Sequence, residues 1–288
     1  MPPSRARTTL ALALLLLATT ACTAAEHEPT PAPQSLTVSR QARQLRLPLD
    51  AYASTVAETH LVEDAQDILI RRCMKDQGMD WKTLPPVDAQ DTEPPNLRRY
   101  GADEAEALRN GYHPSPDPPS VIRRSRAWDA RDALPAEVRR AAYGPSGKGG
   151  CLKAADRQLV GDTAPLDFHA FNQLTGTALE TSRRTPEVRD ALHRWHTCMA
   201  KAGYDYPDPY TAAGDERWET SEPTSAERAT ARADVACQKS TQLVKEWAAA
   251  ETRIQHHLIQ QNTHRLHEAK ARKDHWLAAA RHVLNHEG

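Results

Sequence analysis

Cysteine and histidine are the residue types of this sequence that could do chemistry, because both ligate metals and both take part in nucleophilic catalysis. The chain of 288 residues holds five cysteines and 13 histidines. Two of the cysteines open a nine-residue pattern, C-M-x-x-x-G-[MY]-D-[WY], which occurs at residues 73–81 and again at 198–206. A thiol in such a position could be a buried free cysteine, a metal ligand or half of a disulfide.

Metal and redox chemistry both favour closely spaced cysteines, and no two cysteines of the chain have the C-x-x-C spacing. His193 and His196 precede Cys198, but a disulfide at Cys198 would remove the thiol that a Cys–His nucleophile needs. The sequence contains neither a G-x-S-x-G elbow nor an H-E-x-x-H helix. The glycine-rich run at residues 144–150 lacks the spacing of a phosphate-binding loop. We therefore expect no enzymatic activity and no cofactor.

Seven of the 13 histidines fall between residues 256 and 286. His264 and His267 are three residues apart, and His282 and His286 are four apart, so each pair could share a helix face and bind a metal ion. No acid or cysteine is placed to complete either site within the helix. Solvent-exposed histidines without a metal are the simpler interpretation. A face that responds to pH is a further interpretation, because histidine titrates near neutral pH.

The N-terminus predicts export. An apolar run at residues 10–18 follows two arginines and precedes small residues and Cys22, which is typical of a secretory signal peptide at residues 1–21. The run is too short to span a bilayer. Cys22 occupies the position of the lipid-modified cysteine of a bacterial lipoprotein, although Thr19 stands where the lipobox usually has leucine. We predict lipidation of Cys22, with cleavage by an ordinary signal peptidase as the alternative.

Assigning Cys22 to a lipid leaves an even number of cysteines in an exported protein, which predicts disulfides. Four cysteines allow three connectivities. Each copy of the nine-residue pattern is followed by one later cysteine near the start of a predicted helix. The simplest pairing therefore joins the cysteines in two helix-loop-helix clasps, Cys73 with Cys151 and Cys198 with Cys237.

Each copy of the pattern is also expected to end a helix. Glycine adopts the left-handed conformation of the C′ position without a Cβ penalty, and an apolar pair on either side of it is typical of a Schellman end. At helix starts, a threonine precedes proline in one case and opens a T-x-x-E capping box in another. The predicted cap residues are Gly78 and Gly203 at helix ends and Thr185 and Thr224 at helix starts.

Apolar spacing at helical period, with no alternation typical of strands, predicts an all-α fold. The expected helices span residues 50–77, 102–109, 135–142, 166–182, 185–202 and 224–285. The last contains no glycine or proline, and its polar run at 260–264 predicts a bend. We expect a disordered tether at 22–48, partial disorder in the proline-rich stretch 82–120, a first unit at 49–160 and a second at 161–288.

The leader with Cys22, the two copies of the pattern, the later Cys151 and Cys237 and the long C-terminal helix together resemble lipoproteins of actinobacteria such as Streptomyces. The resemblance covers most of the chain, and its motifs are structural. It implies a location at the cell envelope and implies no reaction.

The net charge of −1 does not favour a nucleic-acid partner. We expect a lipid-anchored binding or scaffolding module on the outer face of the cell membrane, with an envelope protein as partner. The contact would use an apolar stripe on the long helix, for which burial in the core is the competing interpretation: Val244, Trp247, Ile254 and Leu258. The alternative functions are a metal- or pH-responsive sensor that uses the histidine-rich end and, third, an enzyme of unrecognised type.

Overall fold

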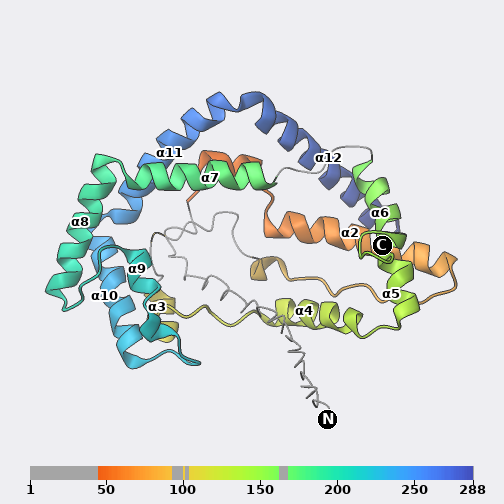
Figure 1. The fold of residues 1–288 in the computed structure, drawn as a ribbon, viewed down its shortest axis with the longest axis horizontal. Coiled ribbons are helices and arrows are strands. Elements are labelled where there is room, and N and C mark those ends of the chain that lie inside the picture. The colour runs from red at the N-terminus through yellow and green to blue at the C-terminus, as the bar shows by residue number, and fades with distance from the viewer. Residues whose placement is uncertain (1–44, 93–99, 101–103, 162–167, 288) are drawn as a thin grey trace, which may run out of the picture. The chain divides into compact units, whose positions relative to one another are not determined.

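A computed structural model describes residues 45–92, 100, 104–161 and 168–287 (Figure 1). The predicted signal peptide, Cys22 and the tether as far as residue 44 lie outside the described residues, as does the start of the helix expected from Leu166. Within the described ranges all regular elements are helical and no strand occurs, which confirms the all-α prediction. No helix among them is both long and apolar enough to cross a membrane.

The elements of the first half begin with a short 3-10 helix, η1. They are η1 (Pro48–Tyr52), α2 (Val56–Asp76), η2 (Ala89–Asp91), α3 (Glu104–Asn110), α4 (Pro119–Asp132), α5 (Ala136–Tyr143) and α6 (Gly150–Val160). The elements of the second half are α7 (Phe168–Arg183), α8 (Pro186–Lys201), α9 (Pro209–Ala213), η3 (Glu216–Trp218), α10 (Ser225–Thr241), α11 (Leu243–Gln261) and α12 (Thr263–Glu287).

The N-terminal helix expected at residues 50–77 is two elements. Thr55 separates η1 from α2, and it forms a capping box that the sequence already shows as T-x-x-E. Its hydroxyl accepts from the Glu58 N–H at 3.0 Å, and its own N–H donates to the Glu58 carboxylate at 2.9 Å. The packed part of the chain also begins earlier than expected, because Leu47, assigned to the tether, is only 4% exposed.

The C-terminal stretch is three helices. The bend expected at residues 260–264 is confirmed, since α11 ends at Gln261 and α12 begins at Thr263, with Asn262 between them. A second break at Gln242 has no glycine or proline signal. Gln242 adopts a left-handed φ of 55°, a conformation that costs a side-chain-bearing residue about 1 kcal/mol. The turn redirects the chain into α11, where Leu243 and Val244 are both buried.

Two hydrophobic clusters form the core, and we name them after the helices that carry the repeated pattern. The α2 core includes Met74, Cys151 and Leu159, and the α8 core includes Trp195, Met199, Cys237 and Trp247. Each cluster takes residues from the other half of the chain. Tyr100, Ala107 and Tyr112 belong to the α8 core, whereas Ala280 and Val283 of α12 belong to the α2 core.

The helix contacts agree with this sharing of residues between the two halves of the chain. Helix α3 lies beside α10, and α12 lies along α2 and α6 (Figure 1). The two clusters therefore do not coincide with the units expected at 49–160 and 161–288. All the described residues belong instead to a single compact unit.

Candidate functional site

The two copies of the pattern form the same helix end. The N–H groups of Met79 and Tyr204 donate to the carbonyls of Met74 and Met199 at 3.0 and 2.9 Å. This is the bond of a Schellman motif that spans six residues of the chain. The glycines before them, Gly78 and Gly203, have φ of 71° and 91°. Both methionines are fully buried. The predicted C-caps are therefore confirmed.

The cysteines pair as the repeat predicts. Cys73 bonds to Cys151, and Cys198 bonds to Cys237, with a Cα–Cα distance of 5.6 Å in each pair. We call the α2–α6 pair the first clasp and the α8–α10 pair the second clasp. One detail of the prediction is wrong. Cys151 lies in the first turn of α6, whereas Cys237 lies near the end of α10, because the break at Gln242 ends that helix.

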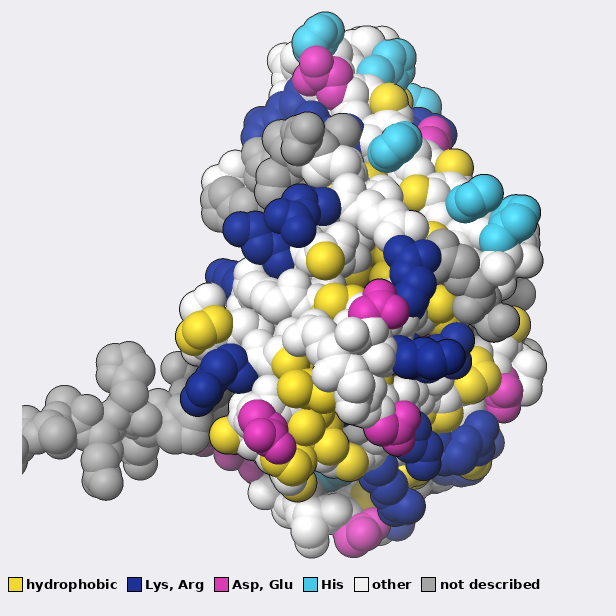
Figure 2. Space-filling view, turned by 90° about the vertical axis from the view of Figure 1, so that its right-hand side faces the viewer, with side chains coloured by type: hydrophobic (Ala, Val, Ile, Leu, Met, Phe, Trp, Pro, Cys, Tyr) yellow, Lys and Arg dark blue, Asp and Glu magenta, His cyan; other side chains and the backbone are white. Residues whose placement is uncertain are grey.

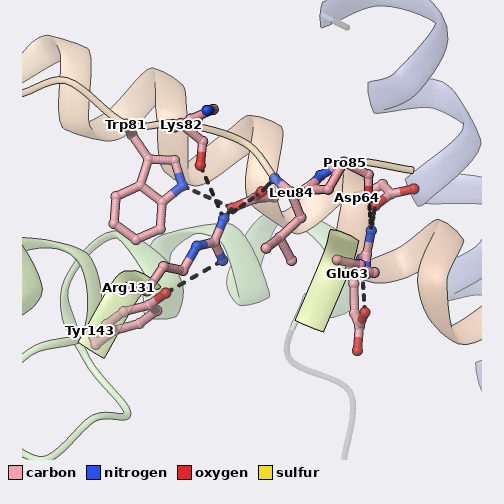
Figure 3. Close-up of polar contacts among 10 residues, drawn as sticks. Glu63, Asp64, Trp81, Lys82, Leu84, Pro85, Arg131 and Tyr143 are labelled. Atoms are coloured by element: carbon pink, nitrogen blue, oxygen red, sulfur yellow. Dashed lines mark hydrogen bonds and ion pairs between the residues drawn. The ribbon is translucent and has the colours of Figure 1, made fainter. Parts of the chain in front are cut away.

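A buried ion pair anchors the segment that leaves the first clasp. Arg131 of α4 donates to both oxygens of Asp67 on α2, at 2.6 and 2.7 Å. The same carboxylate accepts from the indole of Trp81 at 2.8 Å and from the N–H of Leu84 at 2.6 Å. Figure 3 shows Arg131 beside the Trp81 ring and directed towards the Tyr143 hydroxyl, and its guanidinium carbon is 4.6 Å from the centroid of the Trp81 ring. The carboxylate accepts four hydrogen bonds from three donor groups, so this cluster is a structural anchor.

A second ion pair lies close by on the same helices. Arg124 of α4 bonds to Glu63 at 2.9 Å and to Asp64 at 2.7 Å, and it also donates to the carbonyl of Pro85 (Figure 3). Together the two arginines of α4 hold residues 81–85 against α2.

Buried carboxylates also anchor the α8 core. Glu227 accepts from the N–H groups of Tyr112 and His113 at 2.7 and 3.0 Å, and its Oε1 is 2.7 Å from Nδ1 of His113. Asp234 accepts from Trp195 at 2.8 Å and from Gln238 at 2.7 Å. These contacts pin the segment after α3 to α10.

The pKa values of Tyr112, Tyr206 and Asp215, in the α8 core and beside it, are displaced by burial or by hydrogen-bonded neighbours. Burial, and after it the neighbouring Asp234 carboxylate, raises the pKa of Tyr112 well above its ordinary value. Burial and a hydrogen bond to Asp215 raise the pKa of Tyr206 to about 12, and the hydrogen bond from Arg217 holds the pKa of Asp215 far below its usual range. These shifts arise from satisfied structural contacts, which is the common alternative to an active site.

Both predicted helix starts are confirmed in position, but only Thr224 caps its helix with a side-chain hydrogen bond. Thr224 forms the expected capping box with Glu227. Thr185 precedes α8 as expected, but its hydroxyl donates to the carbonyl of Ser182 at 2.9 Å and caps nothing. The Cys–His interpretation of α8 fails, because Cys198 has no thiol and His196 hydrogen-bonds to the carbonyl of Tyr206 at 2.8 Å.

The apolar stripe of α11 is core. Val244 and Trp247 are buried, and the Trp247 indole donates to Ser182 at 2.9 Å. Its ring centroid lies 5.1 Å from that of Tyr100. Ile254 and Leu258 are half-buried. The first half of the stripe therefore belongs to the core, as the competing interpretation predicted, and is not open to a partner.

The histidines of α12 make the most distinctive exposed surface among the described residues. At 3.6 residues per turn, five of them fall within about 100° of arc on one helix face. These residues, which we call the histidine face, are His264, His267, His275, His282 and His286, and all are exposed. Figure 2 shows histidines gathered along this side of the molecule. Sequence reasoning found the pairs and missed His275, whose spacing of 11 and seven residues from His264 and His282 was the available signal.

The opposite face of α12 explains why this one is exposed. Leu266, Leu277, Ala280 and Val283 are buried, which fixes the rotation of the helix. The histidine face is accordingly held towards solvent by core packing.

His282 and His286 form the best-defined pair of this face. Their rings stack with centroids 4.3 Å apart, and Nδ1 of His286 lies 2.8 Å from the carbonyl oxygen of His282. A carbonyl only accepts, so Nδ1 carries the proton and Nε2 of the neutral ring keeps a lone pair for a ligand. At the other end of the face, Nδ1 of His264 is 3.6 Å from the Glu268 carboxylate. No group of three or more metal-ligating side chains occurs in the described part of the chain.

The chain was compared with known protein families, proteins and structures. No family model, no curated protein and no solved structure matches the chain.

Proposed function

We propose that this chain is an exported protein, anchored through Cys22 to the outer face of the cell membrane, that acts as a binding module and not as an enzyme. Two disulfides hold its core, and disulfides persist in oxidising compartments outside the cytoplasm. The buried carboxylates of Asp67 and Glu227 accept several hydrogen bonds each, which supports a structural role for both.

The binding surface of this proposal is the histidine face of α12, and the observation that carries it is the shared orientation of five exposed histidines. The face is built on a rigid helix, so a partner would meet a fixed row of imidazoles. Imidazoles present an apolar body and a polar edge, a combination suited to protein interfaces. The partner we propose is a protein of the cell envelope.

Photo-crosslinking in the native envelope tests this surface. Probes at His264 and His282 should give an adduct with one recurrent protein. A probe at Ala130, exposed on α4, is the matched control and should give none. Equal labelling from α4, or no adduct from either α12 position, would contradict the proposal.

The anchor has a separate test. Cells fed labelled palmitate should label the wild-type protein and should leave the Cys22→Ser variant unlabelled. An unlabelled wild-type protein in the culture medium would show release by an ordinary signal peptidase.

The second candidate is a metal-responsive surface, and the geometry of His282 and His286 favours it. Two imidazoles one turn apart are a familiar two-ligand set for zinc, and Nε2 of His286 is available as a ligand. Titration with Zn²⁺ or Ni²⁺ should show binding that weakens as the pH falls, because protons compete for the imidazoles. His286→Asn should remove that binding, and His275→Asn, on the same face but outside the pair, should leave it. Equal metal affinities of the two variants would exclude His282 and His286 as the metal site.

A further inference from the structure

The two disulfides share one asymmetry of burial. Cys73 is half-buried, whereas its partner Cys151 is only 1% exposed. In the second clasp Cys198 is half-buried and Cys237 is 2% exposed. A thiolate from outside the protein therefore meets the first cysteine of each pair, and the second cysteine has to leave as a thiolate. Which clasp opens more readily then depends on how well the structure stabilises the leaving sulfur.

Cys151 lies where a helix stabilises an anion. It is the second residue of α6, which begins at Gly150, and the N-terminus of a helix presents unpaired N–H groups and a partial positive charge. Gly149 at the N-cap position makes no side-chain hydrogen bond, so no capping side chain competes for these N–H groups. Cysteines at helix N-termini are stabilised as thiolates. The position of Cys151 therefore favours its departure from the disulfide.

A side chain adds a donor to the same sulfur. The amide nitrogen of Gln77, the residue after α2, lies 3.1 Å from Sγ of Cys151 and 3.5 Å from Sγ of Cys73. An amide N–H only donates, and a hydrogen bond to an ionised acceptor is about twice as strong as one to a neutral acceptor. The contact from Gln77 therefore becomes stronger when the Cys151 sulfur gains a negative charge.

Cys237 has neither of these features. It lies near the end of α10, where the partial charge of the helix is negative and disfavours a thiolate. The hydroxyls of Ser240 and Thr241 donate to the carbonyl of Cys237, and the Ser240 hydroxyl is 3.8 Å from the other sulfur, that of Cys198. In the described part of the chain no hydrogen-bond donor contacts Sγ of Cys237. The second clasp therefore has the poorer leaving group.

We propose that the first clasp is a site of thiol–disulfide exchange, whose substrate is a thiolate from outside the protein. The thiolate forms a bond to Sγ of Cys73 as the Cys73–Cys151 bond breaks, and the electron pair of that bond leaves on Sγ of Cys151. The products are a mixed disulfide at Cys73 and a thiolate at Cys151, so the step needs no oxidant or reductant besides the attacking thiolate. The site is separate from the histidine face and does not depend on the function proposed above.

Reaction of the folded protein with reduced glutathione tests the proposal. In the full chain with Cys22→Ser, the four cysteines of the clasps are the only ones left. After a brief incubation, an acid quench and alkylation in denaturant, peptide mass mapping reads each cysteine separately. Glutathione on Cys73 and an alkylated Cys151 should appear at least about tenfold faster than any product of the second clasp.

Three results of this experiment would overturn the proposal. Glutathione on Cys151 would show that the thiolate attacks the other sulfur. Equal rates at the two clasps would show that both open through unfolding of the whole protein. An unmodified first clasp would show that Cys73 is not accessible to a thiolate.

One variant tests the leaving sulfur directly. Gln77→Met removes the donor at an exposed position and should slow the opening of the first clasp about fivefold, with the second clasp unchanged. A substitution that only destabilised the fold would speed the reaction, because the clasp would be exposed more often. Gln90→Met, the same change at an exposed glutamine of η2, is the matched control and should react as the wild type does. A wild-type or faster rate in Gln77→Met would contradict the stabilisation of the leaving sulfur.

Discussion

The first and second clasps share a nine-residue pattern and the same helix end, yet each disulfide reaches a different part of its partner helix. In the first clasp, Cys73 near the end of α2 bonds to Cys151 in the first turn of α6. Gln66 of α2 also bonds to Asp156 of α6. The first disulfide therefore joins the end of one helix to the start of the next.

In the second clasp, Cys198 near the end of α8 bonds to Cys237 near the end of α10. Trp195, one turn earlier on α8, donates to Asp234, one turn earlier on α10. The repeated pattern specifies a helix end and a half-buried cysteine, whereas the intervening chain decides which part of the partner helix the disulfide reaches.

The buried acids of the two regions differ as well. Asp67 beside the first clasp is paired with a cation, Arg131, from a third helix. Asp234 in the second clasp accepts from Trp195, whose indole is neutral, among its other contacts. Removal of the Arg131 cation should therefore have a larger effect than removal of the neutral Trp195 donor.

Loss of the disulfides should have the largest effect on stability. The chain-entropy model gives about 4.5 kcal/mol for the separation of 78 residues and about 4 kcal/mol for that of 39 residues. The paired variants Cys73→Ala/Cys151→Ala and Cys198→Ala/Cys237→Ala should lower the free energy of unfolding in that order, as measured by urea denaturation. A larger loss from the second clasp would show that packing around α8, and not loop length, dominates.

Loss of Arg131 comes next. Arg131→Met leaves the Asp67 carboxylate, whose side chain is 4% exposed, without its cation, which should cost about 3 to 5 kcal/mol. Trp195→Phe removes one neutral donor from Asp234 and should cost about 1 to 3 kcal/mol. Urea denaturation of the two variants compares them directly. Addition of Asp67→Asn to Arg131→Met should recover part of the loss, and no recovery would mean that the charge of Asp67 is not the cause.

The sequence predicts those parts of the fold that depend on neighbouring residues. Gly78 and Gly203 identify the helix ends because only glycine adopts a left-handed conformation without penalty. Thr224 and Glu227 identify a helix start because their capping bonds span three residues. The pairing of cysteines also follows, because the repeat divides the chain into two similar sections.

The remaining features depend on contacts between distant residues. Asp67 and Arg131 are 64 residues apart, and neither is distinguishable from an ordinary surface charge until α4 packs on α2. The places of Tyr100 in the α8 core and of α12 in the α2 core also depend on contacts between distant residues. The histidine face is an intermediate case, since helical period places its residues together but only the burial of Leu277 shows which way they point.

The helix ends at Gly78 and Gly203 should respond alike to substitution. Their loss of stability should be smaller than that of the disulfide and Arg131 variants. Gly78→Ala and Gly203→Ala place a Cβ in open space but at φ of 71° and 91°, which should cost about 1 kcal/mol each. Gly176→Ala, in the interior of α7, also meets nothing within 4 Å and should stabilise the protein by up to about 1 kcal/mol. Thermal melting of the three variants gives the comparison. Unequal losses at the two pattern glycines would mean that the helix ends are not equivalent.

The smallest predicted effect is a pH dependence that arises in the α8 core alone. Both ring nitrogens of His113 face acceptors, with Nδ1 2.7 Å from the Glu227 carboxylate and Nε2 2.8 Å from the carbonyl of Thr220. Only the imidazolium can donate to both at once. Partial burial lowers the pKa of His113, but the hydrogen bonds to Thr220 and Glu227 outweigh it, so the pKa is raised from 6.5.

A histidine whose pKa is raised on folding contributes stability that is fully present below its unfolded pKa, near pH 6.5, and is lost as the pH rises through the folded value. The free energy of unfolding should therefore fall between pH 6 and pH 8, measured by urea denaturation across that range. His113→Gln should flatten the slope, whereas His193→Gln, at an exposed position on α8, should keep it. A slope that persists in His113→Gln would place the titrating group elsewhere, with the exposed histidines of α12 as the next to test. Loss of the slope in His113→Gln alone would show that the α8 core contains a proton-linked anchor, in contrast to the arginine anchor of the α2 core.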